Sequence, residues 1–435
     1  MPGLRGCGQG KYDGAVLSLL TMLACPAPSP PPLDSAPASG WQPPADCGER
    51  MDPTDTLVRW PYVQRVTQTE AVIAFGTTTE AGAARVVWGR EDYWDNQIQA
   101  TLRDLPDVLE TESSSRDELR LFHATLTDLP PGSQVCYRVD VDGETVARGQ
   151  SFWTAPATSD ATVGVLVLGD YGSGTDDQLA VRDAMLPYVA DAQLLLTLGD
   201  NAYSSGRPYE WQANVFEVYE GMLTDLLFLP TWGNHDYSTA NAAPALDSVF
   251  LYENAWRTQD RERYWSTDYG PFHLIGLDTE GPATEIRESE TDDQLDWLEA
   301  DLAAADRPWT VAAWHKPAWS GMPGRAPDPT ALLLFAPVLE DAGVPLVLQG
   351  HNHMYERFAP MRGSQSAAEG DDGTVYVVSG GGGRSLYGIG EVPYQLVVAE
   401  RHHFLFMEAD ACTLTLVAID LEGVELDRTV MERCS

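Results

Sequence analysis

The pattern of apolar and polar positions changes once along the chain, near residue 160. Over residues 57–156, apolar and polar residues alternate with a period of two, most clearly at 122–126 and 135–141. Such alternation is typical of half-buried strands, and Gly- and Pro-containing turns separate these runs. About 100 residues of short strands predict a β-sandwich. We assign it to residues 51–157.

Beyond residue 160 the pattern predicts alternating strands and helices. Apolar runs typical of buried strands occur at 163–168, 194–198, 226–232, 272–277, 309–314, 344–348 and 374–379. Helices are indicated where apolar residues recur three, four or seven positions apart, as at Leu295, Leu298 and Leu302, or at Leu179, Leu186 and Val189. This order predicts an α/β layer structure over residues 161–435, ending in a β-hairpin.

The first 50 residues follow neither pattern. An apolar run at 15–24 after two basic residues is too short to span a bilayer and predicts an export signal at 1–25. Cys25 after Ala24 resembles a bacterial lipoprotein cleavage site, so lipid anchoring at Cys25 and plain secretion are both open. Residues 26–50 predict a Pro-rich linker. Export would place the protein in the cell envelope or outside the cell.

Four cysteines remain for disulfides if the signal is removed and Cys25 is modified. The last two strand-like runs would form a hairpin whose open end brings Cys412 and Cys434 together. By elimination, Cys47 would pair with Cys136. Disulfides would suit an oxidising compartment.

The charge balance excludes one class of partner. The formal net charge is -38, from 65 acidic and 27 basic residues. Such a surface repels polyanions, so we expect no nucleic-acid partner. No other apolar run is long enough for a transmembrane helix, and the oligomeric state cannot be predicted from the sequence.

Residues with metal-ligand side chains follow the predicted strands, each just past a strand end. They are Asp170 in Gly-Asp-Tyr-Gly, Asp200 and Tyr203 in Gly-Asp-Asn-Ala-Tyr, Asn234 in Gly-Asn-His-Asp, His315 after Trp314, and His351 and His353 in Gly-His-Asn-His. Each motif alone is more often a turn, a cap or a buried side chain. Together they indicate one site, because ligands bind at the carboxyl ends of strands in open α/β sheets.

The seven side chains offer oxygen and nitrogen donors and no sulfur, which suits hard to borderline cations. Seven donors are too many for one tetrahedral zinc. They suit two metal ions that share a bridging carboxylate, as in two-metal hydrolases.

The ordered motifs resemble those of the calcineurin-like metallophosphoesterases, and specifically the purple acid phosphatases, in which a tyrosine such as Tyr203 is a ligand. The resemblance implies a four-layer α/β/β/α catalytic sandwich. Residues 129–139 are similar to a fibronectin type III strand, so the preceding β-sandwich is expected to be of that type. Ala312 departs from the family pattern, which has valine there.

The resemblance also implies a role for each residue. The residues implied to hold a trivalent iron are Asp170, Tyr203 and His353. Those implied to hold a divalent zinc, manganese or iron are Asn234, His315 and His351. Asp200 would bridge the two ions. His235 would contact the phosphate or protonate the leaving oxygen, and Asp236 would orient His235.

The predicted function is therefore hydrolysis of phosphate monoesters by an exported acid phosphatase-like enzyme, through attack of a metal-bound hydroxide. A phosphodiesterase or nucleotidase on the same scaffold is an alternative, and so is a non-catalytic surface-binding protein with a vestigial metal site. The loops at 204–222 and 237–268 would shape the pocket, and we expect their aromatic residues to pack rather than bind substrate. Lys316 and Arg357 are expected to bond locally. For Tyr355, packing and substrate contact are both open.

Overall fold

The computed structural model describes residues 46–78, 80–90, 93–103, 119–252, 262–280, 288–363, 365–367 and 372–434. The predicted signal, Cys25 and most of the predicted linker lie outside the described residues. Within the described part of the chain, no helix combines the length and apolar character needed to cross a bilayer.

Two large sheets form the centre of the α/β region. The seven-stranded sheet has the order β12 (Trp265–Tyr269), β13 (Phe272–Gly276), β14 (Trp309–Trp314), β15 (Leu346–Gln349), β19 (Val375–Ser379), β16 (Tyr355–Phe358), β20 (Gln395–Ala399). The ten-stranded sheet has the order β23 (Glu425–Glu432), β22 (Thr413–Asp420), β21 (His403–Ala409), β9 (Val163–Leu168), β10 (Leu194–Leu198), β11 (Leu227–Thr231), β1 (Leu57–Gln64), β2 (Ala71–Thr77), β6 (Arg120–Leu126), β5 (Thr101–Leu102).

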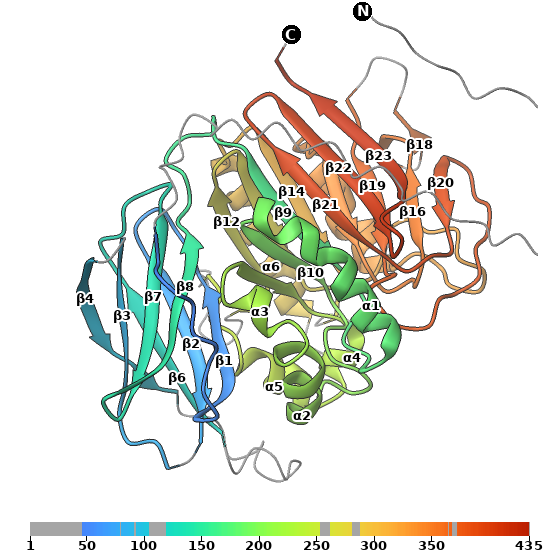
Figure 1. Cartoon of the computed structure of the whole chain (residues 1–435). Coiled ribbons are helices and arrows are strands. Elements are labelled where there is room, and N and C mark those ends of the chain that lie inside the picture. The colour runs from blue at the N-terminus through green and yellow to red at the C-terminus, as the bar shows by residue number, and fades with distance from the viewer. Residues whose placement is uncertain are drawn as a thin grey trace, which may run out of the picture. The chain divides into compact units, whose positions relative to one another are not determined.

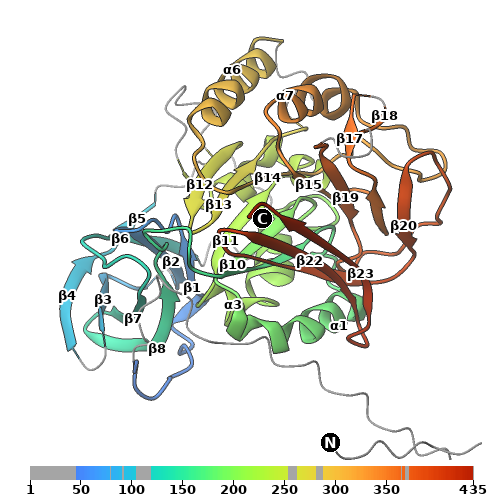
Figure 2. The same cartoon turned by 90° about the horizontal axis from the view of Figure 1, so that it is seen from above.

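Helices cover the outer faces of these sheets, as Figure 2 shows. Helices α6 (Glu288–Ala304) and α7 (Ala336–Asp341) lie outside the seven-stranded sheet, while α1 (Asp176–Met185) and α3 (Glu220–Leu223) lie outside the ten-stranded sheet. This arrangement confirms the predicted α/β/β/α sandwich. Shorter elements lie in the connections, namely α2 (Pro208–Trp211), α4 (Asn234–Tyr237), α5 (Ala243–Leu246), β17 (Met361–Arg362) and β18 (Gln365–Ser366).

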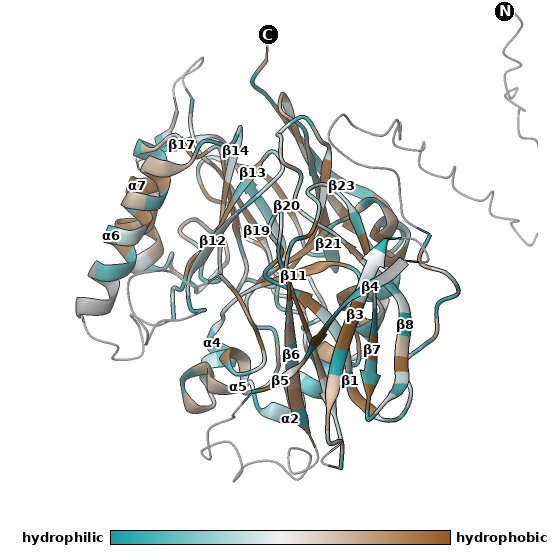
Figure 3. Cartoon of the chain, turned by 90° about the vertical axis from the view of Figure 1, so that its left-hand side faces the viewer, coloured by the Kyte–Doolittle hydropathy of each residue, from teal (hydrophilic) through white to brown (hydrophobic). Residues whose placement is uncertain are grey.

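The parallel strands carry the continuous apolar runs seen in the sequence. Every residue of β9, β10 and β11 is buried, and so is every residue of β13 and β15. Strands that are buried on both faces appear in the sequence as unbroken apolar runs, not as alternating apolar and polar residues. In Figure 3 the strands carry most of the hydrophobic colour, whereas α6 shows hydrophilic stretches.

One predicted helix face is wrong. Leu179 and Leu186 are 38% and 54% exposed, whereas Gln178, Val181 and Met185 are the buried residues of α1. The helix ends at Met185 because Pro187 follows, and the chain continues as a 3-10 helix at Leu186–Asp191. A single helical face therefore does not run from Leu179 to Val189.

The N-terminal region is a β-sandwich, drawn in blue and blue-green in Figure 1. Its separate sheet has the order β4 (Tyr93–Gln99), β3 (Ala84–Arg90), β7 (Gln134–Val141), β8 (Glu144–Trp153). The strands opposite it are β1, β2, β5 and β6, which belong to the ten-stranded sheet because β1 pairs in parallel with β11. The region is consistent with the fibronectin-like domain that the sequence predicts. The domain boundary near 157–161 stays a prediction.

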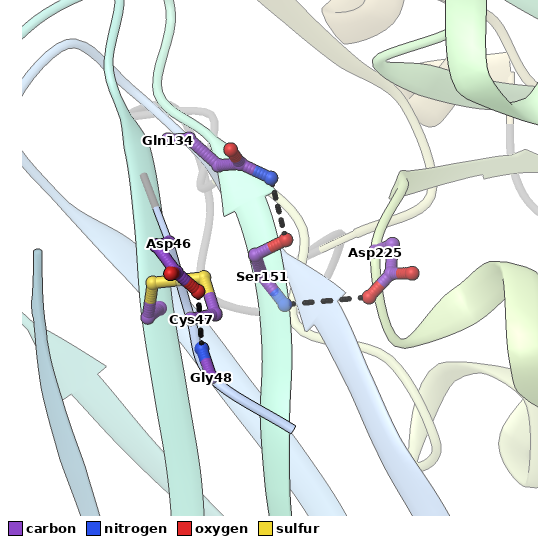
Figure 4. Close-up of a disulfide and its surroundings, with 7 residues drawn as sticks. Asp46, Cys47, Gly48, Gln134, Ser151 and Asp225 are labelled. Atoms are coloured by element: carbon purple, nitrogen blue, oxygen red, sulfur yellow. Dashed lines mark hydrogen bonds between the residues drawn. A yellow bond between two sulfur atoms is a disulfide. The ribbon is translucent and has the colours of Figure 1, made fainter. Parts of the chain in front are cut away.

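Both predicted disulfides are confirmed. Cys47 bonds Cys136 and Cys412 bonds Cys434. Close to the first of them, Ser151 of β8 donates its backbone N–H to Asp225 at 3.4 Å, as Figure 4 shows. Asp225 precedes β11, so this contact joins β8 of the sandwich to the α/β region.

A buried histidine in β13 predicts a pH-dependent part of the stability. His273 Nδ1 lies 2.7 Å from Asp268 Oδ1, and its Nε2 lies 2.9 Å from Asp301 Oδ2. Burial opposes the charged ring, but the hydrogen bonds to these carboxylates dominate and raise the pKa of His273 to about 9. Because this pKa lies above the unfolded value, the stabilisation is fully present below about pH 6.5 and is lost as the pH rises through about 9.

We therefore expect His273→Gln to lower the free energy of unfolding by about 1–3 kcal/mol at pH 6 and by less at pH 10. Chemical denaturation of the variant and the wild type at both pH values measures this difference. An equal loss at pH 6 and pH 10 would contradict the assignment of a charged, paired imidazole.

Candidate metal centre

The seven predicted ligand residues all follow parallel strands at their carboxyl ends. Asp170 follows β9, Asp200 and Tyr203 follow β10, and Asn234 opens α4 just after β11. From the second sheet, His315 follows β14, and His351 and His353 follow β15. Strands β9, β10 and β11 pair in parallel, as do β13, β14 and β15, so these ends meet at one edge of each sheet. The backbone N–H of Gly350 donates to the His315 carbonyl at 2.9 Å and ties neighbouring loops together.

Three of the donor side chains surround the Tyr203 hydroxyl. This oxygen lies 3.2 Å from Asp170 Oδ1, 3.0 Å from Asp200 Oδ2 and 3.2 Å from His353 Nε2. His353 Nε2 is also 3.3 Å from Asp170 Oδ1. We call Asp170, Tyr203 and His353 the tyrosine group.

Two histidines lie near the other oxygen of Asp200. His315 Nε2 lies 3.3 Å from Asp200 Oδ1 and 3.2 Å from His351 Nδ1. One donor atom each from Asp200, His315 and His351 lies within 4.8 Å of the others. Asn234 Oδ1 is buried and has no hydrogen-bond partner among the described residues. We call Asn234, His315 and His351 the histidine group, and Asp200 lies between it and the tyrosine group.

Backbone carbonyls orient the histidine rings. His315 Nδ1 lies 2.8 Å from the Leu198 oxygen, and His353 Nδ1 lies 2.7 Å from the Ser385 oxygen. A carbonyl only accepts hydrogen bonds, so Nδ1 of each ring carries the hydrogen. In its neutral form each ring therefore has its lone pair on Nε2, on the side of the site, which is the arrangement that metal-binding histidines need.

The backbone accepts unfavourable conformations to bring these groups together. Asp170, Asp200 and His351 have φ values of 56°, 49° and 70°, which non-glycine residues adopt rarely and mostly at functional sites. At Gly233, a Cβ atom would lie 2.2 Å from both the backbone nitrogen and Oδ1 of Asp200. Only glycine therefore fits at this position.

The electrostatics of the site favour added positive charge. Burial would raise the pKa of Asp200, but His315 and His235 outweigh it and lower that pKa. Burial would lower the pKa of His315, but the Asp200 carboxylate outweighs it and raises that pKa to about 10. Buried carboxylates are stabilised by nearby cations. Bound metal ions would fit the donor types, the unpartnered Asn234 oxygen and the buried negative charge of Asp200.

His235 lies at the mouth of the site, with its side chain 34% exposed. Its Nε2 is 3.9 Å from Asp200 Oδ2, and its Nδ1 is 2.6 Å from the Ser204 carbonyl oxygen. The Nδ1 atom therefore donates to Ser204, and Nε2 faces the Asp200 carboxylate.

Asp236 does not orient His235 as the sequence predicts. Its buried carboxylate accepts backbone N–H groups of Gly233 at 2.9 Å and of Asn201 and Ala202 at 3.2 Å. These bonds cap α4 and hold the loop after β10, so both oxygens of the Asp236 carboxylate already accept backbone hydrogen bonds. The orienting contact comes from Ser204 instead.

Three residues beside the donor groups were not predicted from the sequence. Tyr387 and Arg384 follow β19, and Arg325 lies in the loop after β14. The ring of Tyr387 stacks on His353 with centroids 4.0 Å apart. Arg325 Nη1 lies 2.8 Å from His351 Nε2, and the guanidinium carbon of Arg384 lies 5.0 Å from the Tyr203 ring centre. The glycine run at 380–383 was a signal of close packing there, but no motif marked these three side chains.

The expected local contacts are confirmed. Lys316 Nζ lies 2.8 Å from Glu280 Oε2, and Arg357 Nη2 lies 2.9 Å from Asp427 Oδ1. Tyr355 also bonds Asp427, at 2.7 Å. The pocket-loop aromatics Trp211 and Tyr237 are buried, Tyr209 is exposed, and Trp256 lies outside the described residues.

Known proteins are similar to this chain in sequence. Residues 164–355 match the family model "Calcineurin-like phosphoesterase". Acid phosphatase A of Cryphonectria parasitica is 32% identical over 297 residues, which cover 57% of this chain and 58% of that protein. "Probable inactive purple acid phosphatase 24" of Arabidopsis thaliana is 25% identical over 312 residues, 61% of this chain and 49% of that protein. The chain thus spans about half the length of these relatives.

The fold has a counterpart among solved structures. Purple acid phosphatase PPD1 from yellow lupin (Lupinus luteus) seeds superposes with a TM-score of 0.74 at 19% identity, over 86% of this chain and 74% of that one. The likeness extends beyond the residues matched by the family model. Residues 164–355 of the chain are thus similar to the calcineurin-like phosphoesterases, and its fold is that of a purple acid phosphatase.

Proposed function

We propose that this protein is an exported phosphatase that hydrolyses phosphate monoesters at a centre of two metal ions. The observation that carries the proposal is the position of Asp200. Its Oδ2 lies 3.0 Å from the Tyr203 hydroxyl, and its Oδ1 lies 3.3 Å from His315 Nε2. A carboxylate with one oxygen toward each of two donor groups is suited to bridge two ions.

The two donor groups differ in chemistry. The tyrosine group contains two anionic oxygen donors once the Tyr203 phenol is deprotonated, which favours a trivalent iron. The histidine group offers neutral nitrogen and amide oxygen donors, which suit a divalent zinc, manganese or iron. Burial raises the pKa of Tyr203, and the Asp170 and Asp200 carboxylates raise it further, so the phenolate needs a strong local cation.

The side chains of the site divide the work between binding and proton transfer. The chemistry that two bound cations supply here is activation of a water and neutralisation of charge on the phosphoryl oxygens. His235 holds its hydrogen on Nδ1 against Ser204, so a protonated ring has its second N–H on Nε2, at the mouth of the site. From there it can donate a proton to the leaving oxygen. Asp236 fixes the loops that carry Asp200 and His235.

A phosphodiesterase is the second candidate, because the same donor groups would suit a site for phosphate diesters as well as monoesters. A non-catalytic protein is the third, and the name of the Arabidopsis relative, "probable inactive", keeps it open. The close approach of Asp170, Asp200, Tyr203, His315, His351 and His353 supports the catalytic candidate. We also propose export, supported by the two disulfides. Lipid attachment at Cys25 and plain secretion are both compatible with that proposal.

Metal content tests the division into two groups. We expect Asp200→Ala to lose both metals and at least about 1,000-fold in kcat, because it removes the shared ligand. His353→Ala should lose mainly the iron, and His351→Ala mainly the divalent ion. Elemental analysis of the purified variants measures this, with the exposed Asp183→Asn on α1 as a control that keeps both metals. An Asp200→Ala variant with two metals and full turnover would refute the bridge.

The Tyr203 assignment has its own spectroscopic signature. A phenolate bound to trivalent iron absorbs visible light by charge transfer, so the oxidised, metal-loaded protein should be coloured. Tyr203→Phe should lose this band, while Tyr209→Phe, at an exposed position, should keep it. A metal-replete wild type without the band would exclude the iron–tyrosine pair but leave hydrolysis itself open.

A further inference from the structure

Two arginines beside the donor groups have no carboxylate partner within the described part of the chain. They are Arg325, next to His351, and Arg384, next to Tyr203. Elsewhere Arg50, Arg357 and Arg428 each bond an Asp or Glu. In a chain with 65 acidic and 27 basic residues, acidic partners are plentiful. A guanidinium left without one at the proposed centre suggests an anion from outside the chain.

Arg325 is the more firmly held toward the centre. Its Nη1 lies 2.8 Å from His351 Nε2 and donates to the His351 carbonyl at 3.2 Å. Its Nη2 donates to the Tyr387 hydroxyl at 3.0 Å. Tyr387 is fixed in turn, because its ring stacks on His353 and its backbone N–H donates to the His353 carbonyl at 3.0 Å. The guanidinium is thus connected to both histidines of the Gly-His-Asn-His motif.

The tautomer of His351 decides what Arg325 can bind. A neutral imidazole has one N–H and one lone pair. Nδ1 of His351 faces His315 Nε2 at 3.2 Å, so Nδ1 is the atom that the histidine group would use as a ligand. Ligation through Nδ1 puts the hydrogen on Nε2, and Nη1 of Arg325 then loses its ring acceptor. Two N–H groups do not stay face to face at 2.8 Å, so Nη1 turns away from Nε2 while Nη2 keeps its contact to Tyr387, and an N–H of Nη1 becomes available to another acceptor.

We propose that Arg325 binds a terminal oxygen of the substrate's phosphoryl group and makes the site prefer phosphate monoesters to diesters. This inference rests on the proposed function. A guanidinium forms strong, charge-assisted hydrogen bonds to phosphate oxygens. A monoester dianion carries more charge and one more terminal oxygen at phosphorus than a diester monoanion, so a fixed cation favours the monoester. Tyr387 is a positioning residue for this contact.

Kinetics on two esters test the preference. With 4-nitrophenyl phosphate, Arg325→Gln should lower kcat/KM by about 10- to 100-fold, the usual effect of losing a charged hydrogen bond. With bis(4-nitrophenyl) phosphate, the loss should stay below about threefold. Arg325→Lys should fall between wild type and Arg325→Gln, and Tyr387→Phe should shift the monoester-to-diester ratio in the same direction. Arg428→Gln, which removes an exposed arginine paired with Glu425, should change neither ester.

Binding of inorganic phosphate provides a readout that does not need turnover. Calorimetry on the metal-loaded proteins should show phosphate affinity at least about 10-fold weaker in Arg325→Gln, with unchanged metal content. The role of Arg325 would be overturned by equal losses of kcat/KM for both esters, by a wild type that prefers the diester, or by an unchanged phosphate affinity. A metal-loaded wild type that binds no phosphate would overturn it as well. A wild type that binds phosphate but cleaves no ester would contradict the proposed catalysis alone, and the affinity comparison would still decide the role of Arg325.

Discussion

The structure depends on one buried carboxylate, that of Asp200, which two sets of side chains share. Its two oxygens face different neighbours, the Tyr203 hydroxyl on one side and His315 Nε2 on the other. The chain adopts a left-handed conformation at Asp200 and has a glycine at position 233 to fit around this group. A buried carboxylate is costly unless cations or hydrogen bonds compensate it. His315 and the Tyr203 hydroxyl do so here, and bound metal ions would compensate the same charge more strongly.

The double sheet makes this arrangement feasible. The ten-stranded sheet contributes the loops with Asp170, Asp200 and Asn234, and the seven-stranded sheet contributes those with the three histidines. Neither sheet alone would bring both donor groups together. Tyr355 and Arg357 of β16 bond Asp427 of β23, which joins the two sheets away from the donor groups. Packing of the buried strands thus fixes the distances on which the chemistry depends.

Much of the fold could be predicted, because buried parallel strands leave unbroken apolar runs in the sequence. The ligand motifs also stood out, because each lies directly after such a run. The Leu179 to Val189 face was predicted wrongly because Pro187 ends the helix, a local effect that periodicity ignores. Asp236 was misassigned because its neighbour in sequence is not its neighbour in space. Arg325 and Tyr387 were missed because they reach the site from loops that carry no motif.

The central claim is that two metal ions lie on either side of Asp200. A crystal structure of the metal-loaded protein, with anomalous diffraction recorded at the iron edge and above and below it, tests this directly. We predict two peaks about 3.5–4 Å apart, with iron next to Tyr203 and the divalent ion next to His315, each in contact with one oxygen of Asp200. A single peak, or two peaks that do not share Asp200, would contradict the account.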